Sequence, residues 1–126
     1  MEFTSRKLAD VVLAVPAGSI DHPNAVKLQQ ALAPFVDEGS STGRAPLVLD
    51  FTGVEYISSM GLRVLMVASK ALRARNAAMA IAGLQPAVEE IFDIARFRMV
   101  VDVFPSVRDA LAAISPDAAK AYGAAE

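Results

Sequence analysis

The sequence contains no cysteine and no tryptophan, and its only histidine is His22. The absence of cysteine excludes disulfide bonds and thiolate metal sites, and it is compatible with a reducing cytoplasm. A single histidine beside a proline at a helix start is more typical of a capping or exposed residue than of a catalytic one. No grouping of acids, bases or phosphate-loop residues suggests an active site. We therefore expect a protein without catalytic residues, metal or cofactor.

Long apolar runs and an excess of positive charge are also missing. Stretches such as Val11–Val15 are interrupted by proline, glycine or charge far short of the roughly 20 residues that a membrane helix needs. The first 15 residues lack the pattern of a signal peptide. The formal net charge is −2, which argues against a nucleic-acid partner. We expect a cytoplasmic protein that binds neither membrane nor nucleic acid and is monomeric when free.

The order of apolar segments indicates an α/β fold in one domain. Strands that alternate with helices at this spacing favour crossover connections and a mostly parallel sheet. We predict a sheet of about four or five strands with an antiparallel pair at its N-terminal edge, and about four helices. The predicted strands are Phe3–Leu8, Val11–Val15, 47–51, Met79–Ala82 and Met99–Phe104, and the predicted helices begin at Asp21, Ser58, Pro86 and Ser106.

Two segments are expected outside these elements. Residues 38–44 are predicted to form a loop; they superficially resemble a phosphate cradle but lack the Gly-Lys-Ser/Thr ending and precede a strand. Residues 116–126 have little to bury, so the domain is expected to cover residues 1–115 and to be followed by a flexible tail.

The stretch LVLDFTGVEYISSMGLRVL, residues 47–65, is the most informative part of the chain. Its apolar start predicts a strand buried on both faces, and helical spacing begins at Leu62. Between them lie the Thr52-Gly53 turn and the small residues Ser58-Ser59-Met60-Gly61. Two hydroxyl groups therefore stand at a helix start beside the carboxyl end of a buried strand, where open α/β sheets usually meet ligands and partners.

The string DFTGVEYISSMGLRVL resembles the signature of STAS domains, specifically the bacterial anti-sigma factor antagonists. Aligned on Gly61-Leu62, Ser59 falls on the serine that a partner kinase phosphorylates in that family, and Asp50 falls on the acid that ends the strand. Ser58 stands where aspartate is usual, and Met60 where serine or threonine is usual. The resemblance implies phosphorylation at Ser59, with Ser58 as second choice. It also implies a partner-binding surface made of Asp21, Asp50, Thr52, Ser58, Met60, Gly61, Leu62, Arg63 and Met66.

The residues themselves suggest how these roles divide. Ser58 is expected to cap the helix, leaving the Ser59 hydroxyl exposed, and Gly61 is expected to let a partner approach closely. Asp50 could orient the Ser59 loop, contact the kinase or bond to its own turn. The helical spacing places Leu62 and Met66 on a partly exposed ridge bordered by Arg63, Lys70 and Arg73, which either forms a docking patch or lies under a neighbouring helix.

As a whole, the resemblance implies an anti-sigma factor antagonist that acts by partner switching. The unmodified chain would bind a GHKL-type serine kinase that is also the anti-sigma factor, and so free a sigma factor. Phosphorylation of Ser59 would end the binding, and a phosphatase of the PP2C type would restore it. The chain would then be a substrate and a ligand, not an enzyme. The alternatives are a STAS scaffold or sensor module without phosphorylation, and a domain that binds a nucleotide or lipid.

Overall fold

A mixed β-sheet forms the middle layer of the protein, which we describe from a computed structural model of residues 1–37 and 45–125. β1 and β2 are antiparallel, and all other neighbouring strands are parallel, in the order β1-β2-β3-β5-β6 with β4 beside β2. The predicted α/β fold with an antiparallel N-terminal pair is confirmed. The strands are β1 (Glu2–Leu8), β2 (Val11–Ile20), β3 (Leu47–Asp50), β4 (Val54–Ile57), β5 (Met79–Ala82) and β6 (Asp102–Phe104).

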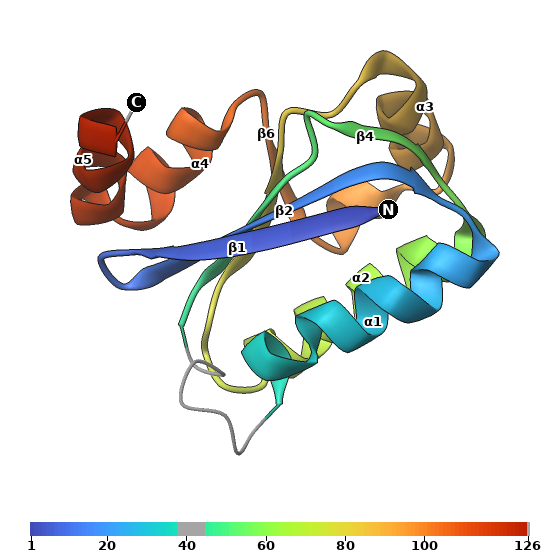
Figure 1. Ribbon diagram of the computed structural model, residues 1–126, viewed down its shortest axis with the longest axis horizontal. Helices are drawn as coiled ribbons and strands as arrows, with labels where there is room; N and C mark the ends of the chain where they lie inside the picture. Colours follow the sequence, from blue (N-terminus) through green and yellow to red (C-terminus); the bar gives the residue numbers. More distant parts are fainter. Residues whose placement is uncertain (38–44, 126) are drawn as a thin grey trace.

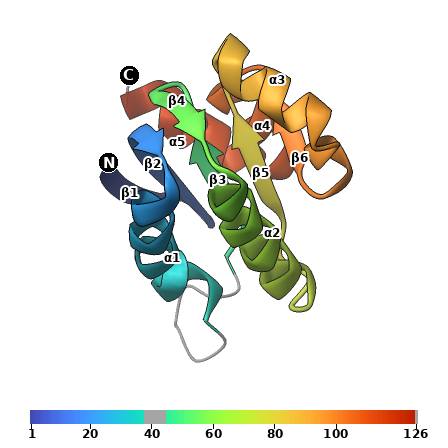
Figure 2. The same cartoon turned by 90° about the vertical axis from the view of Figure 1, so that its right-hand side faces the viewer.

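Helices cover both faces of this sheet. Figures 1 and 2 show α1 and α2 side by side on one face and α4 and α5 on the other. α3 packs against β4 and is followed by a short 3₁₀ helix, η1. The helices are α1 (His22–Val36), α2 (Ser59–Arg73), α3 (Pro86–Ile94), η1 (Phe97–Met99), α4 (Val107–Ile114) and α5 (Pro116–Ala125).

The apolar run Leu47–Leu49 in β3 follows from this arrangement. Leu47 and Leu49 pack into a core with α1 and α2, whereas Val48 packs into a second core with α4 and α5. All three side chains are fully buried. Successive side chains of a strand point to opposite faces, so each of these three positions faces one of the two cores, and the polar residue Asp50 stands only at the end of the strand.

β2 is longer than predicted, because it continues through Pro16 and Gly18 to Ile20. Its first half pairs with β3 and its last three residues pair with β4. Pro16 lies between these two stretches. It has no backbone N–H to donate, but no parallel strand pairs with β2 at this position. Gly18 has φ +98° at the irregularity where the register shifts. The predicted end of the strand at Val15 was therefore wrong.

Two further elements differ from the prediction. Residues 54–57 form a strand that was not predicted, with Val54 and Ile57 buried beside the second half of β2. The predicted strand from Met99 to Phe104 is a 3₁₀ turn followed by the shorter β6. Met99 is 81% exposed, and Arg96 has φ +53°, which ends α3 and redirects the chain.

The residues after Ser115 form α5, a helix that the sequence pattern did not predict. Ser115 Oγ donates a hydrogen bond to Asp10 Oδ1 at 2.6 Å and accepts one from the Ala118 amide at 3.2 Å. Ala118 is fully buried in the second core, and the Arg6 guanidinium lies 5.5 Å from the centre of the Tyr122 ring. These contacts fix the start of α5 against β1 and its turn. The predicted loop at 38–44 lies outside the described residues.

Candidate functional site

The carboxyl ends of β2 and β4 place the starts of α1 and α2 next to each other. Ile20 and Ile57 are register partners in these parallel strands, and the Ser58 amide donates a hydrogen bond to the Ile20 carbonyl oxygen at 2.8 Å. Asp21 and Ser58 follow directly and are the N-caps of α1 and α2. Neighbouring strands lie about 4.8 Å apart. The site thus unites two helix starts that are far apart in the sequence.

Ser58 caps α2 as expected. Its Oγ accepts a hydrogen bond from the Gly61 amide at 3.1 Å, and its carbonyl oxygen accepts one from the Leu62 amide at 3.0 Å. Its backbone is extended, with φ −80° and ψ 167°, as an N-cap requires. A serine therefore performs here the capping that an aspartate would perform.

Ser59 is the first residue of α2, and its side chain is exposed. Because Ser58 supplies the cap, none of the capping bonds in the structure uses the Ser59 hydroxyl. Met60 is also exposed, by 37% of its surface. An exposed hydroxyl on a rigid helix start can be reached by a modifying enzyme.

Gly61 is buried, contrary to the expectation that it clears space for a partner. A β-carbon at this position would lie 2.7 Å from Ile57 Cγ1 and 2.9 Å from Ile20 Cγ2. Such distances are shorter than a van der Waals contact. The missing side chain thus allows α2 to sit directly on β2 and β4.

The two acidic candidates, Asp21 and Asp50, lie in different parts of the site. Asp21 Oδ1 accepts a hydrogen bond from the Asn24 amide at 3.0 Å, beside the start of α2. Asp50 Oδ1 accepts hydrogen bonds from Thr52 N at 2.9 Å and Thr52 Oγ1 at 2.8 Å, so the carboxylate holds its own turn. Gln85 Nε2 donates to the Thr52 carbonyl oxygen at 2.8 Å. β4 separates this turn from Ser58 by about 13 Å, so Asp50 does not orient the Ser59 loop directly.

Comparison with known proteins supports one family. The sequence matches the STAS domain over residues 3–110. The chain belongs to the STAS domain family. It is 35% identical over 113 residues to BtrV of Bordetella bronchiseptica, which is named as an anti-sigma factor antagonist; the match covers 90% of this chain and 93% of BtrV. This STAS domain thus falls among the anti-sigma factor antagonists.

Solved structures share the fold. The crystal structure of an anti-sigma factor antagonist from Thermotoga maritima matches with a TM-score of 0.80 at 19% identity, covering 89% of this chain and 93% of that one. The structure of SpoIIAA from Bacillus in its phosphorylated form matches with a TM-score of 0.66 at 13% identity, covering 90% of this chain and 99% of that one.

Leu62 and Met66 of this STAS domain are partly exposed, as expected. Leu62 and Met66 are half-buried against the main core, and on the same ridge Ser69 Oγ and Arg73 Nη2 donate to the Val100 carbonyl oxygen at 3.2 and 2.8 Å. The segment after α3 therefore contacts the C-terminal part of that ridge. Val67, at 53% exposure, is more exposed than Leu62 or Met66.

A groove between α1 and α2 was not predicted from the sequence. It has a volume of about 320 Å³ and spans about 16 Å of α2, from Met60 to Ala71. No periodicity within one helix can reveal a groove that two helices form together. Its lining residues are Gln29, Leu32, Ala33, Val36, Asp37, Met60, Arg63, Val64, Val67, Ala68 and Ala71.

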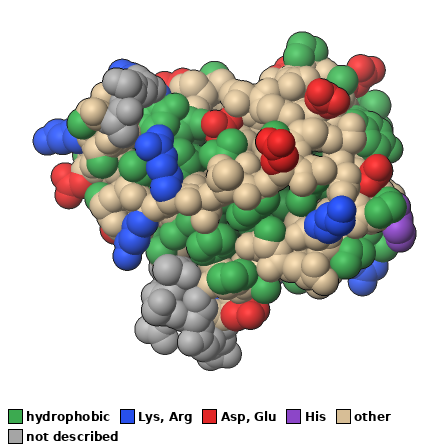
Figure 3. All heavy atoms as spheres, in the orientation of Figure 1, with side chains coloured by type: hydrophobic (Ala, Val, Ile, Leu, Met, Phe, Trp, Pro, Cys, Tyr) green, Lys and Arg blue, Asp and Glu red, His purple; other side chains and the backbone are tan. Residues whose placement is uncertain are grey.

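The described residues contain neither a metal-binding cluster nor a membrane-spanning helix. Lys and Arg side chains are interspersed with acidic and hydrophobic ones on the face shown in Figure 3. Within residues 1–37 and 45–125, no group of three or more metal-ligating side chains occurs. No helix in the same part of the chain has the length and apolar character to cross a bilayer. Exposed residues around the start of α2 remain the candidate site.

Proposed function

We propose that this STAS domain is a switchable ligand of an anti-sigma factor, controlled by phosphorylation of Ser59. The unmodified chain binds an anti-sigma factor that is a serine kinase of the GHKL type, and a sigma factor is released. A PP2C-type phosphatase returns the modified chain to its binding form. The chain acts in the cytoplasm as a substrate and a ligand and catalyses no step. One observation carries this proposal: Ser59 is exposed at the start of α2 while Ser58 does the capping.

The covalent step is a phosphoryl transfer to Ser59 Oγ. The kinase brings a nucleoside triphosphate, whose γ-phosphoryl group forms the new O–P bond as the nucleoside diphosphate leaves and the serine hydroxyl loses its proton. Hydrolysis by the phosphatase breaks that bond and yields inorganic phosphate. The modified side chain carries about −1.5 to −2 charge at pH 7.

The added charge acts by direct blockage of the contact. A phosphate at the start of α2 interacts favourably with the helix dipole by only about 0.3–1 kcal/mol, so the helix keeps its structure. Turning a mostly bound population into a mostly free one requires about 5.5 kcal/mol of differential affinity. An unpaired dianion buried in a protein interface can supply several kcal/mol. Ser59 must therefore lie inside the contact.

The relatives support this assignment in outline. BtrV is named as an anti-sigma factor antagonist and covers most of this chain, and SpoIIAA has a structure in a phosphorylated form. The name of BtrV agrees with an anti-sigma factor as partner, and the SpoIIAA structure agrees with control by phosphorylation.

Labelling by the cognate kinase tests the site. Wild-type chain, Ser59→Ala and Ser58→Ala are incubated with the kinase and labelled nucleoside triphosphate, and the modified peptide is identified by mass spectrometry. We expect Ser58→Ala to be labelled and Ser59→Ala to remain unlabelled. Equal labelling of Ser59→Ala and wild type would move the site elsewhere. Absence of label on every chain would favour the scaffold function instead.

A further inference from the structure

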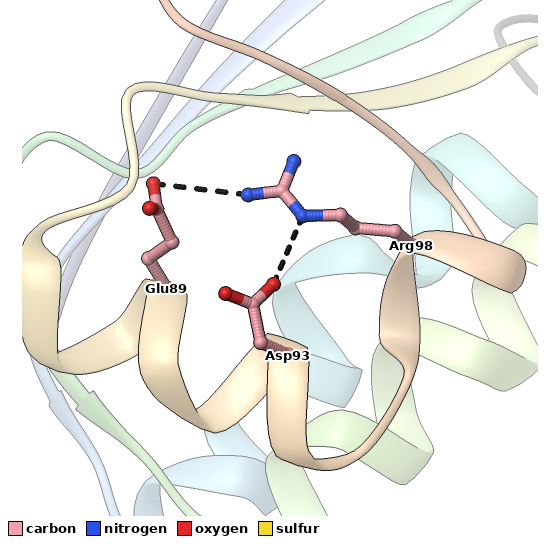
Figure 4. A network of polar contacts seen from close by, with 3 residues as sticks. All are labelled: Glu89, Asp93 and Arg98. Carbon is pink, nitrogen blue, oxygen red and sulfur yellow. Dashed lines mark hydrogen bonds and ion pairs between the residues drawn. The ribbon is translucent and has the colours of Figure 1, made fainter.

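Arg63 is exposed on α2, at the edge of the groove between α1 and α2. Within the part of the chain that the structure describes, its guanidinium has no hydrogen bond, ion pair or ring contact. Most other arginines of this part are engaged. Arg73 donates to Val100, Arg98 contacts Asp93 at 3.0 Å and Glu89 at 3.7 Å (Figure 4), and Arg6 lies over the Tyr122 ring.

The spacing on α2 brings Arg63 close to Ser59. Residues four apart lie on the same helix face, with Cβ atoms about 5–6 Å apart. Helical side chains point toward the N-terminus, so the Arg63 side chain lies over the turn that begins at Ser59. An anion at i and a cation at i+4 is also the more favourable order of such a pair. A phosphate on Ser59 would be within reach of this guanidinium.

The surroundings of Arg63 also suggest its partner in the unmodified chain. The exposed apolar side chains Met60 and Val67 lie on either side of it along the groove. A protein that covers these side chains also removes water from the guanidinium. A desolvated guanidinium needs a charged acceptor, and a carboxylate matches its geometry best.

We propose that Arg63 binds a carboxylate of the anti-sigma factor in the unmodified chain and the phosphate of Ser59 in the modified chain. The inference rests on the proposed function, since it needs the same partner and the same modified residue. Phosphorylation then acts twice: it adds charge to the contact and it takes the guanidinium away from the partner's carboxylate.

The intramolecular pair is tested without any kinase. Phosphoserine is incorporated at position 59 during translation, and the second ionisation of its phosphate is titrated by ³¹P NMR. We expect Arg63→Gln to raise that pKa by about 0.4 unit, because a cation four residues away favours the dianion. Arg96→Gln is the matched control: Arg96 is exposed at the end of α3, and its guanidinium also has no polar contact in the described residues. A pKa unchanged by Arg63→Gln overturns the pair.

The carboxylate contact is tested with the purified anti-sigma factor kinase of the same host. We expect Arg63→Gln to weaken binding of the unmodified chain about tenfold, Arg63→Lys to recover part of the loss, and Arg96→Gln to change nothing. Undiminished binding by Arg63→Gln overturns this half of the inference. Undiminished binding by Ser59→Asp refutes the blockage mechanism instead, so the two failures are distinguishable. A kinase that does not bind the wild-type chain refutes both the proposed function and the carboxylate contact.

Discussion

The Ser58 amide donates a hydrogen bond to the carbonyl oxygen of Ile20 at 2.8 Å, which ties the start of α2 to the end of β2. Asp21, the cap of α1, follows Ile20 directly. The candidate site is thus built on backbone contacts between two parallel strands. Its geometry should tolerate changes of the exposed side chains and respond strongly to changes at the buried ones.

Gly61→Ala should destabilise the protein by about 1–3 kcal/mol, because the added methyl group overlaps Ile57 and Ile20. Urea denaturation measures the loss. The matched control is Gly123→Ala in α5, where an added methyl group has no neighbour within 4 Å. That substitution should be neutral or stabilising by up to about 1 kcal/mol. Equal effects of the two changes would refute the packing role of Gly61.

Ser58→Ala should cost about 1 kcal/mol of unfolding free energy, since the Gly61 amide loses its acceptor. Ser58→Asp should retain most of that stability, because aspartate is an equally good N-cap. Ser59→Ala should change stability little, as its exposed hydroxyl caps nothing. Thermal or chemical denaturation of the three variants separates capping from modification. A larger loss for Ser59→Ala than for Ser58→Ala would reverse the assignment.

Ser59→Asp should weaken binding to the anti-sigma factor by more than tenfold, whereas Ser59→Ala should bind within about threefold of wild type. The physical reason is a carboxylate placed inside a contact that desolvates it. Isothermal titration calorimetry measures both affinities. Raising the salt concentration should not restore the affinity of Ser59→Asp, since a desolvation penalty is not screened by salt as surface repulsion is.

Ser115→Ala should loosen α5 and cost about 1–3 kcal/mol, because Asp10 and the Ala118 amide both lose a partner. Hydrogen exchange measured by mass spectrometry should show faster exchange in residues 116–125, with β3 and β5 unaffected. Ser106→Ala removes the cap of α4 and serves as a comparison. If α5 amides exchange equally fast in wild type and Ser115→Ala, Ser115 does not anchor the helix.

The sequence was sufficient to predict the elements whose local signals agree with their burial. The run from Leu47 to Leu49 is apolar because both faces are covered, and Ser58 caps α2 because its spacing to Gly61 is that of an N-cap. The mostly parallel orientation of the strands was predicted from the alternation of strands and helices. Such features depend on residues that are close in the chain.

The features that were missed depend on distant residues. β4 is a strand because β2 continues beside it, and α5 is a helix whose cap also bonds to Asp10, over a hundred positions away. The expectation that Gly61 lets a partner approach missed that Ile20 and Ile57 lie directly against it. The groove between α1 and α2 was missed for the same reason, since residues of both helices line it.

The close fit of α2 over Ile20 and Ile57 also bears on how long a signal at Ser59 would last. Because α2 packs directly on these buried side chains, it has little room to slide or rotate. The state of the proposed switch would then depend on the phosphate ester at Ser59 alone. Enzyme rates would then set the duration of the response, with no relaxation of the protein to add a delay.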